Sequence, residues 1–425
     1  MANEYLRRLR EATPSPSGSG LPMTRAELAA AVNQYIWSTT GKHCHLDVDT
    51  LARYERGLIR WPSAMYRDGL RAVLGAQTDA GLGFYPTPRG RSTASLSNPQ
   101  SWAVPRDTDA EDPAASTDMG RAMASLRRVL VSYRPDRVAG SSPDAVKRGV
   151  AASFSAYQAG RYEDSALRVV DAMRGLRNNT DLRVRALAHQ IAAIVLTKAG
   201  HADIAWIAAD RGVFAAEAAE DARLHLSLIR TAAFAMAAGG HHADALTSID
   251  AAAHGFQRHM AQTPASASVY GTLLLSGAVL AAGHGNPRLA STYLDEAQRA
   301  ADVNAIDRND LWTAFGPTNV AIHRANVAAA LGDMDAVLSV GGALSVEHLP
   351  VERQVRLHLD VARASLAVGD REDALATLVR AEATAPSQVR HHHITKDVVT
   401  SLIATAQRRP GAALTRLATL VGVAP

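Results

Sequence analysis

A recurring turn in the C-terminal part of the chain constrains the fold more than any other feature. A glycine is followed five positions later by a small residue, between two segments of helical apolar periodicity, at Gly160/Ser165, Gly200/Ala205, Gly240/Ala245 and Gly369/Ala374. Glycine readily ends one helix, and a small residue lets the next helix pack closely against it. The pattern therefore predicts a stack of helical hairpins.

Two more glycines fit this pattern less regularly. Gly332 has its small residue one position early, at Ala336, and Gly283 fits only if Gly285-Asn286-Pro287 is an insertion. With them, about six hairpins cover residues 144–385, and residues 387–409 are expected to form a capping helix. Abundant alanine and only 5% aromatic residues favour closely packed helices over a β core. We predict an all-α fold.

The N-terminal part contains a separate helical pattern between Pro22 and Trp61. Thr24-Arg25-Ala26-Glu27 is a capping box, followed by apolar residues at helical spacing up to Ile36 and a stop at Thr39-Thr40-Gly41. Asp47 or Asp49 can cap a second helix that ends at Gly57. Two short capped helices joined by a turn can place the second one in the major groove of DNA.

Short elements are expected on both sides of this pattern. Residues 4–11 predict a first helix with Tyr5, Leu6 and Leu9 inward and three arginines outward. Residues 63–74 predict a closing helix, and residues 79–85 an apolar tail that packs back onto the domain.

The end of the second helix carries a family resemblance. Arg53-Tyr54-Glu55-Arg56-Gly57, followed by Ile59-Arg60-Trp61-Pro62, resembles the ending of lambda-repressor-like (XRE/Cro-type) helix-turn-helix domains. The resemblance implies that Glu55 and Arg56 are largely structural and that residues earlier in the helix meet the bases. The 23 positions from Leu28 to Leu51 exceed the usual spacing of that family, so residues 35–46 must lengthen the first helix or the turn.

Basic and polar residues of this segment are the candidate DNA contacts. Arg53 and Thr50 lie on the predicted exposed side of the second helix, where an arginine can contact guanine, and Lys42 and Arg60 are better placed for phosphates. The predicted DNA-binding residues are Thr24, Lys42, Thr50, Arg53, Arg56 and Arg60. The alternative is that Arg53 and Arg56 only form surface ion pairs with Asp49 and Glu55. Residues 1–91 hold 12 basic and 8 acidic residues, which accounts for the whole net charge of +4.

The turn beginning at Gly160 carries a second resemblance. Gly160, Tyr162 and Ser165 match the G-x-Y-x-x-A turn of tetratricopeptide repeats, although the spacing between turns is longer than the roughly 34 residues of that repeat. The resemblance implies that the first helix of each pair lines a concave surface.

A candidate ligand site follows from this placement. Asn319, His323 and Asn326 form one stripe of uncharged polar side chains on a predicted helix, and Trp312 and Phe315 precede it. By the same placement His189, His225 and Tyr270 would face the same hollow. Amides and an imidazole beside aromatic rings suit a peptide backbone or a small polar signal. The alternative is a hydrogen-bond network between helices, without a ligand.

No catalytic or cofactor motif is recognised. The sequence lacks G-x-G-x-x-G, a Walker loop, H-E-x-x-H and G-x-S-x-G, so we expect neither an enzyme nor a cofactor. His43-Cys44-His45 and His391-His392-His393 are interpreted as a surface turn and a solvated helix start rather than metal sites. Cys44 is the only cysteine, which excludes an intramolecular disulfide. The sequence contains no run of eighteen or more apolar residues, the length that a membrane-spanning helix needs. A soluble, cytoplasmic protein is therefore expected.

These patterns predict three parts. Residues 1–85 form a helix-turn-helix domain, residues 86–118 a Pro/Ser-rich linker with Trp102 as an exception, and residues 119–425 a tetratricopeptide-like array. The combination resembles peptide-sensing regulators of the quorum-sensing superfamily. It implies a transcriptional regulator that binds operator DNA as a homodimer and responds to a signalling peptide or small molecule. The alternative is a protein-interaction scaffold with an accessory helix-turn-helix domain.

Overall fold

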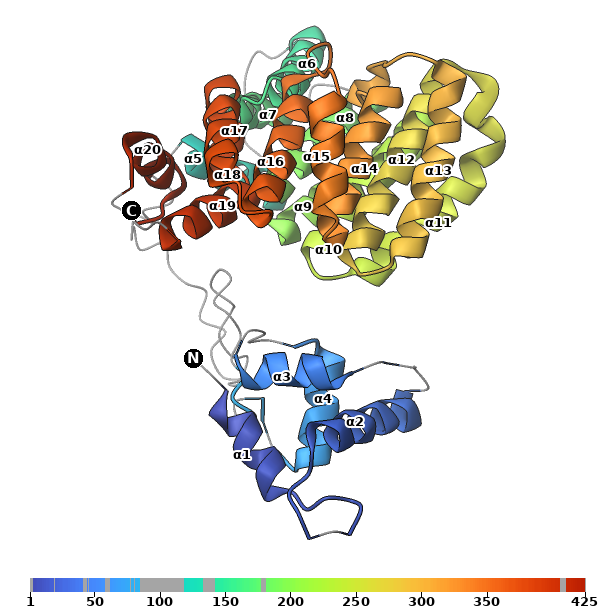
Figure 1. Cartoon of the computed structure of the whole chain (residues 1–425). Helices are drawn as coiled ribbons and strands as arrows, with labels where there is room; N and C mark the ends of the chain where they lie inside the picture. Colours follow the sequence, from blue (N-terminus) through green and yellow to red (C-terminus); the bar gives the residue numbers. More distant parts are fainter. Residues whose placement is uncertain are drawn as a thin grey trace. The chain divides into compact units, whose positions relative to one another are not determined.

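The computed structural model describes residues 3–18, 20–40, 44, 46–57, 62–76, 78–79, 81–84, 118–132, 142–176, 181–405 and 410–424. The chain divides into two compact units, Met1–Thr108 (unit 1) and Asp109–Pro425 (unit 2). Within the described ranges both units are built from α-helices and contain no β-strand, which confirms the all-α fold (Figure 1).

The described residues of unit 1 form four helices around a small apolar core. They are α1 (Glu4–Ala12), α2 (Arg25–Thr40), α3 (Val48–Glu55) and α4 (Ala64–Leu74). Glu27 N donates to Thr24 Oγ1 at 3.2 Å and Thr24 N donates to Glu27 Oε2 at 2.8 Å, so the predicted capping box begins α2. Leu28, Val32 and Ile36 of α2 are buried, and Leu82 and Phe84 close the core as the predicted apolar tail.

The orientation of α1 differs from the prediction in two residues. Leu6 is buried and Leu9 partly buried, but Tyr5 is exposed. Arg10, expected to point outward, is buried because its guanidinium forms an ion pair with Glu55 of α3. Helical periodicity places Arg10 on the same face as Leu6, and the buried carboxylate makes that position favourable for a cation.

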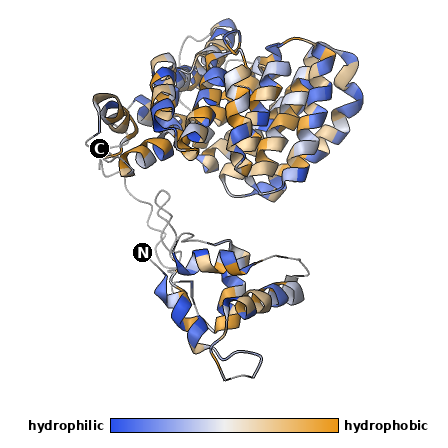
Figure 2. Cartoon of the chain, in the orientation of Figure 1, coloured by the Kyte–Doolittle hydropathy of each residue, from blue (hydrophilic) through white to orange (hydrophobic). Residues whose placement is uncertain are grey.

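Unit 2 contains six helical hairpins in the residues that are described. The first helices are α6 (Pro143–Gln158), α8 (Leu182–Lys198), α10 (Ala222–Ala238), α12 (Pro264–Gly283), α14 (Pro317–Leu331) and α16 (Val351–Ala367). The second helices are α7 (Tyr162–Gly175), α9 (Ala202–Ala218), α11 (His242–Phe256), α13 (Pro287–Asn304), α15 (Met334–Ala343) and α17 (Arg371–Thr384). Each first helix packs on its partner and on its neighbours (Figure 1), and Figure 2 shows hydrophobic and hydrophilic residues along these helices.

A left-handed glycine joins the helices of each hairpin, and one of them is not the predicted residue. Gly160, Gly200, Gly240, Gly332 and Gly369 all have positive φ, as the pattern requires. In the fourth hairpin the left-handed residue is Gly285 (φ 76°), because Gly283 is still part of α12. The repeat is thus more regular than the sequence suggested.

The buried residue five positions after each glycine is likewise regular. Ser165, Ala205, Ala245 and Ala374 are fully buried, and Ser165 Oγ donates to the Ser153 carbonyl of α6 at 2.9 Å. Counting from Gly285 gives Ala290, which is also fully buried. In the fifth hairpin Val337 takes this position and is buried, whereas Ala336 is only half-buried.

The beginning and the end of unit 2 are in contact. α16 packs against α6, and α18 (Pro386–His391) packs against α7 (Figure 1). Tyr162 N donates to Ser387 Oγ at 3.0 Å, and His391 Nε2 lies 2.9 Å from Glu163 Oε1. A Cβ at Gly160 would lie 2.6 Å from Ala385 Cβ, so glycine also permits this close approach. The array therefore returns onto its own first hairpin.

Further helices flank the hairpins. α5 (Asp118–Val131) precedes them, and η3 (Gln257–Gln262) and η4 (Asp310–Trp312) are short 3-10 helices between them. The single capping helix expected at 387–409 is instead two helices, α18 and α19 (His393–Ala404), and α20 (Ala412–Val421) follows. His392 is extended (ψ 126°) and breaks the segment, which lets α18 reach α7 while α19 packs on α16.

α12 is the one described helix that is long and apolar enough to cross a membrane. Its apolar window is 89% buried within unit 2. It packs against α10, α13 and α14, so its hydrophobicity is accounted for by a core position.

Candidate functional site

The helix predicted to contact DNA, α3, is short, capped and one-sided. Asp47 caps it by accepting a hydrogen bond from Thr50 N at 2.7 Å, and this bond holds the pKa of Asp47 below its usual value. Leu51 and Tyr54 are buried, whereas Arg53 is exposed on the opposite side and Thr50 is half-buried. The exposed side therefore presents Arg53 to solvent.

The arginines of this surface are not held by the ion pairs considered as an alternative. Among the described residues Arg53 forms no ion pair, and Arg56 Nε donates instead to the Ala52 carbonyl at 3.2 Å. Glu55 is directed inward, with its side chain only 3% exposed. Its carboxylate pairs with Arg10 at 2.6 Å and with Arg25 at 2.7 Å, which ties α3 to α1 and α2.

The long spacing between Leu28 and Leu51 is taken up mainly by a longer first helix. α2 continues to Thr40, and α3 begins at Val48. Asn33 of α2 fixes the chain just before α3, because its Nδ2 donates to the Leu46 carbonyl at 2.8 Å and its Oδ1 accepts from Leu46 N at 2.9 Å. Cys44 Sγ donates to the same Oδ1 at 3.2 Å. This amide clamp has no sequence signature that separates it from any other surface asparagine.

The other predicted DNA contacts fall into two groups. Thr24 is exposed at the start of α2, and its hydroxyl serves the capping box by donating to Glu27 Oε2 at 2.9 Å. Lys42 and Arg60 lie outside the described residues.

The polar stripe on α14 faces α16. Asn326 Nδ2 donates to Asp360 Oδ2 of α16 at 2.9 Å. His323 Nδ1 lies 2.8 Å from the Asn319 carbonyl, so Nδ1 carries the proton and Nε2 is left as an acceptor. Asn319 is completely buried, yet neither atom of its side-chain amide has a hydrogen-bond partner among the described residues. A buried amide without partners is costly, so this position is suited to a bound polar group.

Beside this stripe lies a group of charged side chains that the sequence did not single out. They come from α8, α10 and α16, and we call them the central basic cluster: Lys198, Arg230, Glu352, Arg353, Arg356 and Asp360. Four cations face two carboxylates, a net charge of +2. The members lie up to 162 positions apart in the chain, so no local motif could have revealed them.

Glu352 is the centre of the cluster. Its carboxylate accepts from Tyr157 Oη of α6 at 3.3 Å, pairs with Arg353 at 3.0 Å and lies 3.9 Å from Lys198 Nζ. Burial alone would raise the pKa of Glu352, but the charges of Arg353 and Lys198 bring it below its ordinary value. The carboxylate is therefore ionised and shared among several donors.

Burial lowers the pKa of the cations and of the neighbouring imidazole, whereas it would raise that of a carboxyl group. Burial lowers the pKa of Lys198 and lowers that of Arg230 to about 10. Burial, reinforced by Arg353, lowers the pKa of His323 to about 3, so this imidazole is neutral at pH 7. The Lys198 side chain nevertheless keeps 37% of its exposure, which means that solvent reaches a group surrounded by protein.

The loop between α13 and α14 reaches α6. Trp312 stacks on Phe154 with ring centroids 4.3 Å apart, and the side chains of Asn309 and Gln158 exchange two hydrogen bonds of 2.9 Å. Leu311, Trp312 and Ala314 all have positive φ (48°, 56° and 49°), a conformation that costs non-glycine residues energy. Trp312 is thus a contact between distant hairpins.

Phe315 was predicted to contact a ligand, but it belongs to the core. It is fully buried, and a Cβ at Gly271 of α12 would lie 1.9 Å from its Cζ. The glycine of α12 makes room for the ring, which leaves Phe315 without a free face.

The three remaining predicted ligand residues each contact a second helix. His189 packs on Gly212 of α9, where burial lowers its pKa to about 3. His225 Nε2 lies 3.3 Å from Glu217 of α9, and Tyr270 Oη donates to Glu296 of α13 at 3.3 Å. Their place in one shared hollow with the α14 stripe stays a prediction.

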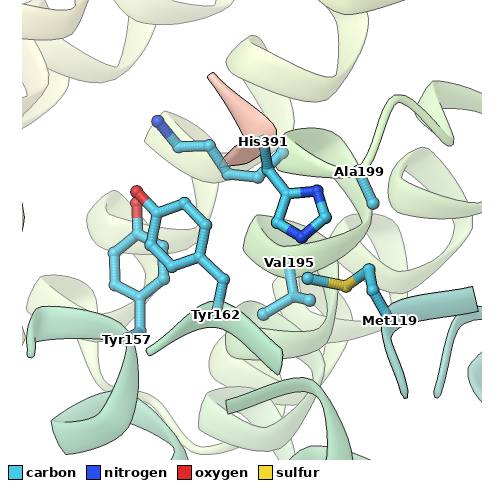
Figure 3. A pocket seen from close by; sticks show the side chains of 7 residues that line it. Met119, Tyr157, Tyr162, Val195, Ala199 and His391 are labelled. Carbon is cyan, nitrogen blue, oxygen red and sulfur yellow. The ribbon is translucent and has the colours of Figure 1, made fainter. Parts of the chain in front are cut away.

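A small cavity adjoins Lys198. Its volume of about 10 Å³ is at the lower limit for one water molecule. It is lined by Met119, Tyr157, Tyr162, Val195, Lys198, Ala199 and His391, and Figure 3 shows the two tyrosine rings side by side with their hydroxyl groups pointing the same way. The cavity lies between α5, α6, α7 and α8 on one side and α18 on the other.

The histidine triplet is structural rather than a solvated helix start. His391 contacts Glu163, and His392 is buried with its Nε2 2.8 Å from Arg356 Nη1. Only His393 is exposed. No cluster of three or more metal-ligating side chains occurs in the described part of the chain, and His43 and His45 lie outside it.

No protein-family model matches the chain, and no similar curated protein or solved structure was found.

Proposed function

We propose that this protein is a sequence-specific DNA-binding transcriptional regulator. In this proposal unit 1 contacts operator DNA through α3, and unit 2 binds a peptide or small-molecule signal that controls operator binding. The protein would act in the cytoplasm as a homodimer, since paired recognition helices read inverted repeats.

The exposed side of α3 carries the proposal. Arg53 is exposed and forms no ion pair with a described residue, while the buried side of α3 is fixed by Leu51, Tyr54 and Glu55. A rigid helix with a free arginine is suited to bidentate contact with guanine in the major groove. Thr50, one turn before, is suited to a second polar contact on the same side.

The arrangement of unit 2 supports a sensor. Polar groups of α14 and α16 gather beside the central basic cluster, and the Asn319 amide is buried without a partner among the described residues. A buried amide without a partner among the described residues is available to hydrogen-bond a ligand.

Selection of bound duplexes from a random pool, followed by fluorescence anisotropy at several salt concentrations, tests this function. The selected duplex should bind at least about 10³-fold more tightly than random DNA. Arg53→Ala should relax the preference at one base pair by about 1–3 kcal/mol. Arg8→Ala, an exposed arginine of α1, is the matched control and should keep the sequence preference. Equal affinity for selected and random DNA would exclude the proposal.

A protein-interaction scaffold is the second candidate, because unit 2 has an open groove beside α9, α10 and α11. The groove has a volume of about 520 Å³ and includes Trp206, which is 40% exposed, and Met236. Partly exposed Trp and Met are frequent anchors of protein interfaces. If Trp206→Ala abolishes recovery of a specific partner while DNA selection yields no consensus, this reading replaces the first.

A further inference from the structure

We propose that the central basic cluster binds the anionic group, a carboxylate or a phosphate, of the molecule that unit 2 senses. The inference rests on the proposed function only in calling that molecule the signal. The anion site itself follows from the charges and contacts of unit 2.

The charge balance of the cluster is the first argument. Lys198, Arg230 and Arg353 are all electrostatically coupled to one carboxylate, Glu352, while Arg356 pairs with Asp360 at 3.2 Å. Arg230 forms no ion pair with any described residue. Cations gathered in a partly desolvated place repel one another unless an anion balances them, so an additional negative group is favoured here.

Unused donors are the second argument. Arg230 Nε and Arg353 Nε are buried and have no hydrogen-bond partner among the described residues. Guanidinium groups bind carboxylate and phosphate oxygens through paired N–H donors, and these contacts are stronger than neutral hydrogen bonds. Two arginines from different helices, α10 and α16, therefore supply donors of the right kind for one anion.

The neutral groups of α14 restrict the ligand further. His323 is electrostatically coupled to Arg353 and Arg356, and its proton is on Nδ1, so Nε2 is an acceptor. An acceptor beside cations favours a ligand that carries an N–H or O–H donor next to its negative group. Hydrogen phosphate and an N-acylated amino acid both meet this condition.

Access to the cluster is the third argument. The side chains of Lys198, Arg353 and Arg356 are 37%, 19% and 22% exposed to solvent. A structural ion network sealed in a core excludes solvent, whereas these cations remain reachable. The cluster also joins α8, α10 and α16 and contacts α6 through Tyr157, so an anion here would bridge hairpins from the beginning and the end of unit 2.

The test uses the full chain in low-salt buffer and two probes, inorganic phosphate and N-acetylglycine. Chloride at matched ionic strength is the reference. Thermal unfolding and titration calorimetry should show stabilisation by at least one probe beyond chloride, with one site per chain. A response to phosphate alone identifies a phosphate-bearing ligand, and a response to N-acetylglycine alone identifies a carboxylate.

Variants identify the site. Arg230→Met should weaken binding of that probe by about 10- to 100-fold, as expected for loss of a charged hydrogen bond. Without anion the same variant should unfold at an equal or higher temperature than the wild type, because a repelling charge has been removed. Arg223 is an exposed residue of the same helix, and Arg223→Met should change neither the affinity for the probe nor the unfolding temperature. Lys198→Met is the second variant if Arg230→Met does not fold.

Two results would overturn the anion site. One is a wild-type protein stabilised no more by either probe than by chloride. The other is a folded Arg230→Met or Lys198→Met variant that keeps the full response. DNA binding is measured separately, so anion binding without a DNA preference would reject the regulator and keep the site. A DNA sequence preference without anion binding would reject the anion site and keep the regulator.

Discussion

Tyr157 of α6 donates a hydrogen bond to Glu352 of α16 at 3.3 Å, although 195 positions separate the two residues. This bond joins the first hairpin of unit 2 to the last one. It also places a phenol beside the central basic cluster, where burial and the charge of Glu352 raise the pKa of Tyr157 far above its ordinary value. The hydroxyl is therefore a permanent donor, and the hairpins that bracket the array meet at a charged site.

The buried ion pair of unit 1 predicts a large loss of stability. Glu55→Ala removes the carboxylate between Arg10 and Arg25 and leaves the buried Arg10 with the exposed Glu11 and the Met23 carbonyl in place of a buried carboxylate. Breaking a buried pair in this way should cost about 3–5 kcal/mol. Hydrogen exchange mass spectrometry should show faster exchange in α1–α3. Asp68→Asn, which removes an exposed partner of Arg71 in α4, should change exchange in α1–α3 little. Unchanged protection in Glu55→Ala would contradict the structural role.

The amide clamp before α3 predicts a change in thiol reactivity. Asn33→Ala removes the acceptor of Cys44 Sγ and both bonds to Leu46. Burial raises the pKa of the Cys44 thiol, so the wild-type protein should react slowly with a disulfide reagent. The variant should react several times faster, and Cys44 is the only cysteine that can report. Gln34→Ala, an exposed neighbour, should react like the wild type.

The close contact between α12 and Phe315 predicts opposite effects for two glycine substitutions. Gly271→Ala would place a methyl group within the Phe315 ring and should destabilise unit 2 by about 1–3 kcal/mol or more. Gly255→Ala in α11 meets nothing within 4 Å and should stabilise by about 0.4–1 kcal/mol. Thermal unfolding measures both. Adding Phe315→Leu to Gly271→Ala should recover part of the loss, and absence of rescue would show that the clash is not the cause.

Two histidines whose pKa values are lowered in the folded protein predict a dependence of stability on pH. The pKa values of His189 and His323 are about 3 in the folded protein, below the ordinary 6.5. The unfolded chain therefore binds more protons as pH falls below 6.5, and stability is lost from there toward pH 3, by at most about 1.4 kcal/mol per pH unit for each group. Urea midpoints measured between pH 7.5 and 5.5 should fall less steeply for His323→Gln than for the wild type. His254→Gln, an exposed control, should keep the wild-type slope.

Local features were predictable because their causes are local. Turn glycines such as Gly160, the capping box at Thr24 and the burial of Leu51 follow from helical periodicity and backbone conformation. Gly285 was not predicted as the turn glycine of the fourth hairpin, because Gly283 also precedes a segment that could begin the second helix. Pro287 at the first turn of α13 nevertheless favours the later glycine.

Contacts between distant residues were not predictable. Arg10 reads as a surface arginine until Glu55 is placed beside it, and Arg230 reads as one more cation on an alanine-rich helix. The surroundings of both arginines are set by residues of helices that come much later in the chain. The contacts of His189 and His225 with α9 were not predictable for a related reason, because helix position alone does not say which neighbouring helix a side chain meets.

The return of unit 2 onto its own first hairpin has a consequence for synthesis of the chain. Glu163 finds His391 only after 228 further residues have been made, which takes roughly 10–50 s at the usual rate of translation. In an open repeat array each hairpin needs only its neighbours. Here the face of α7 that contacts α18 stays uncovered after α7 leaves the ribosome. This face is exposed to chaperones and to incorrect partners until α18 has been synthesised.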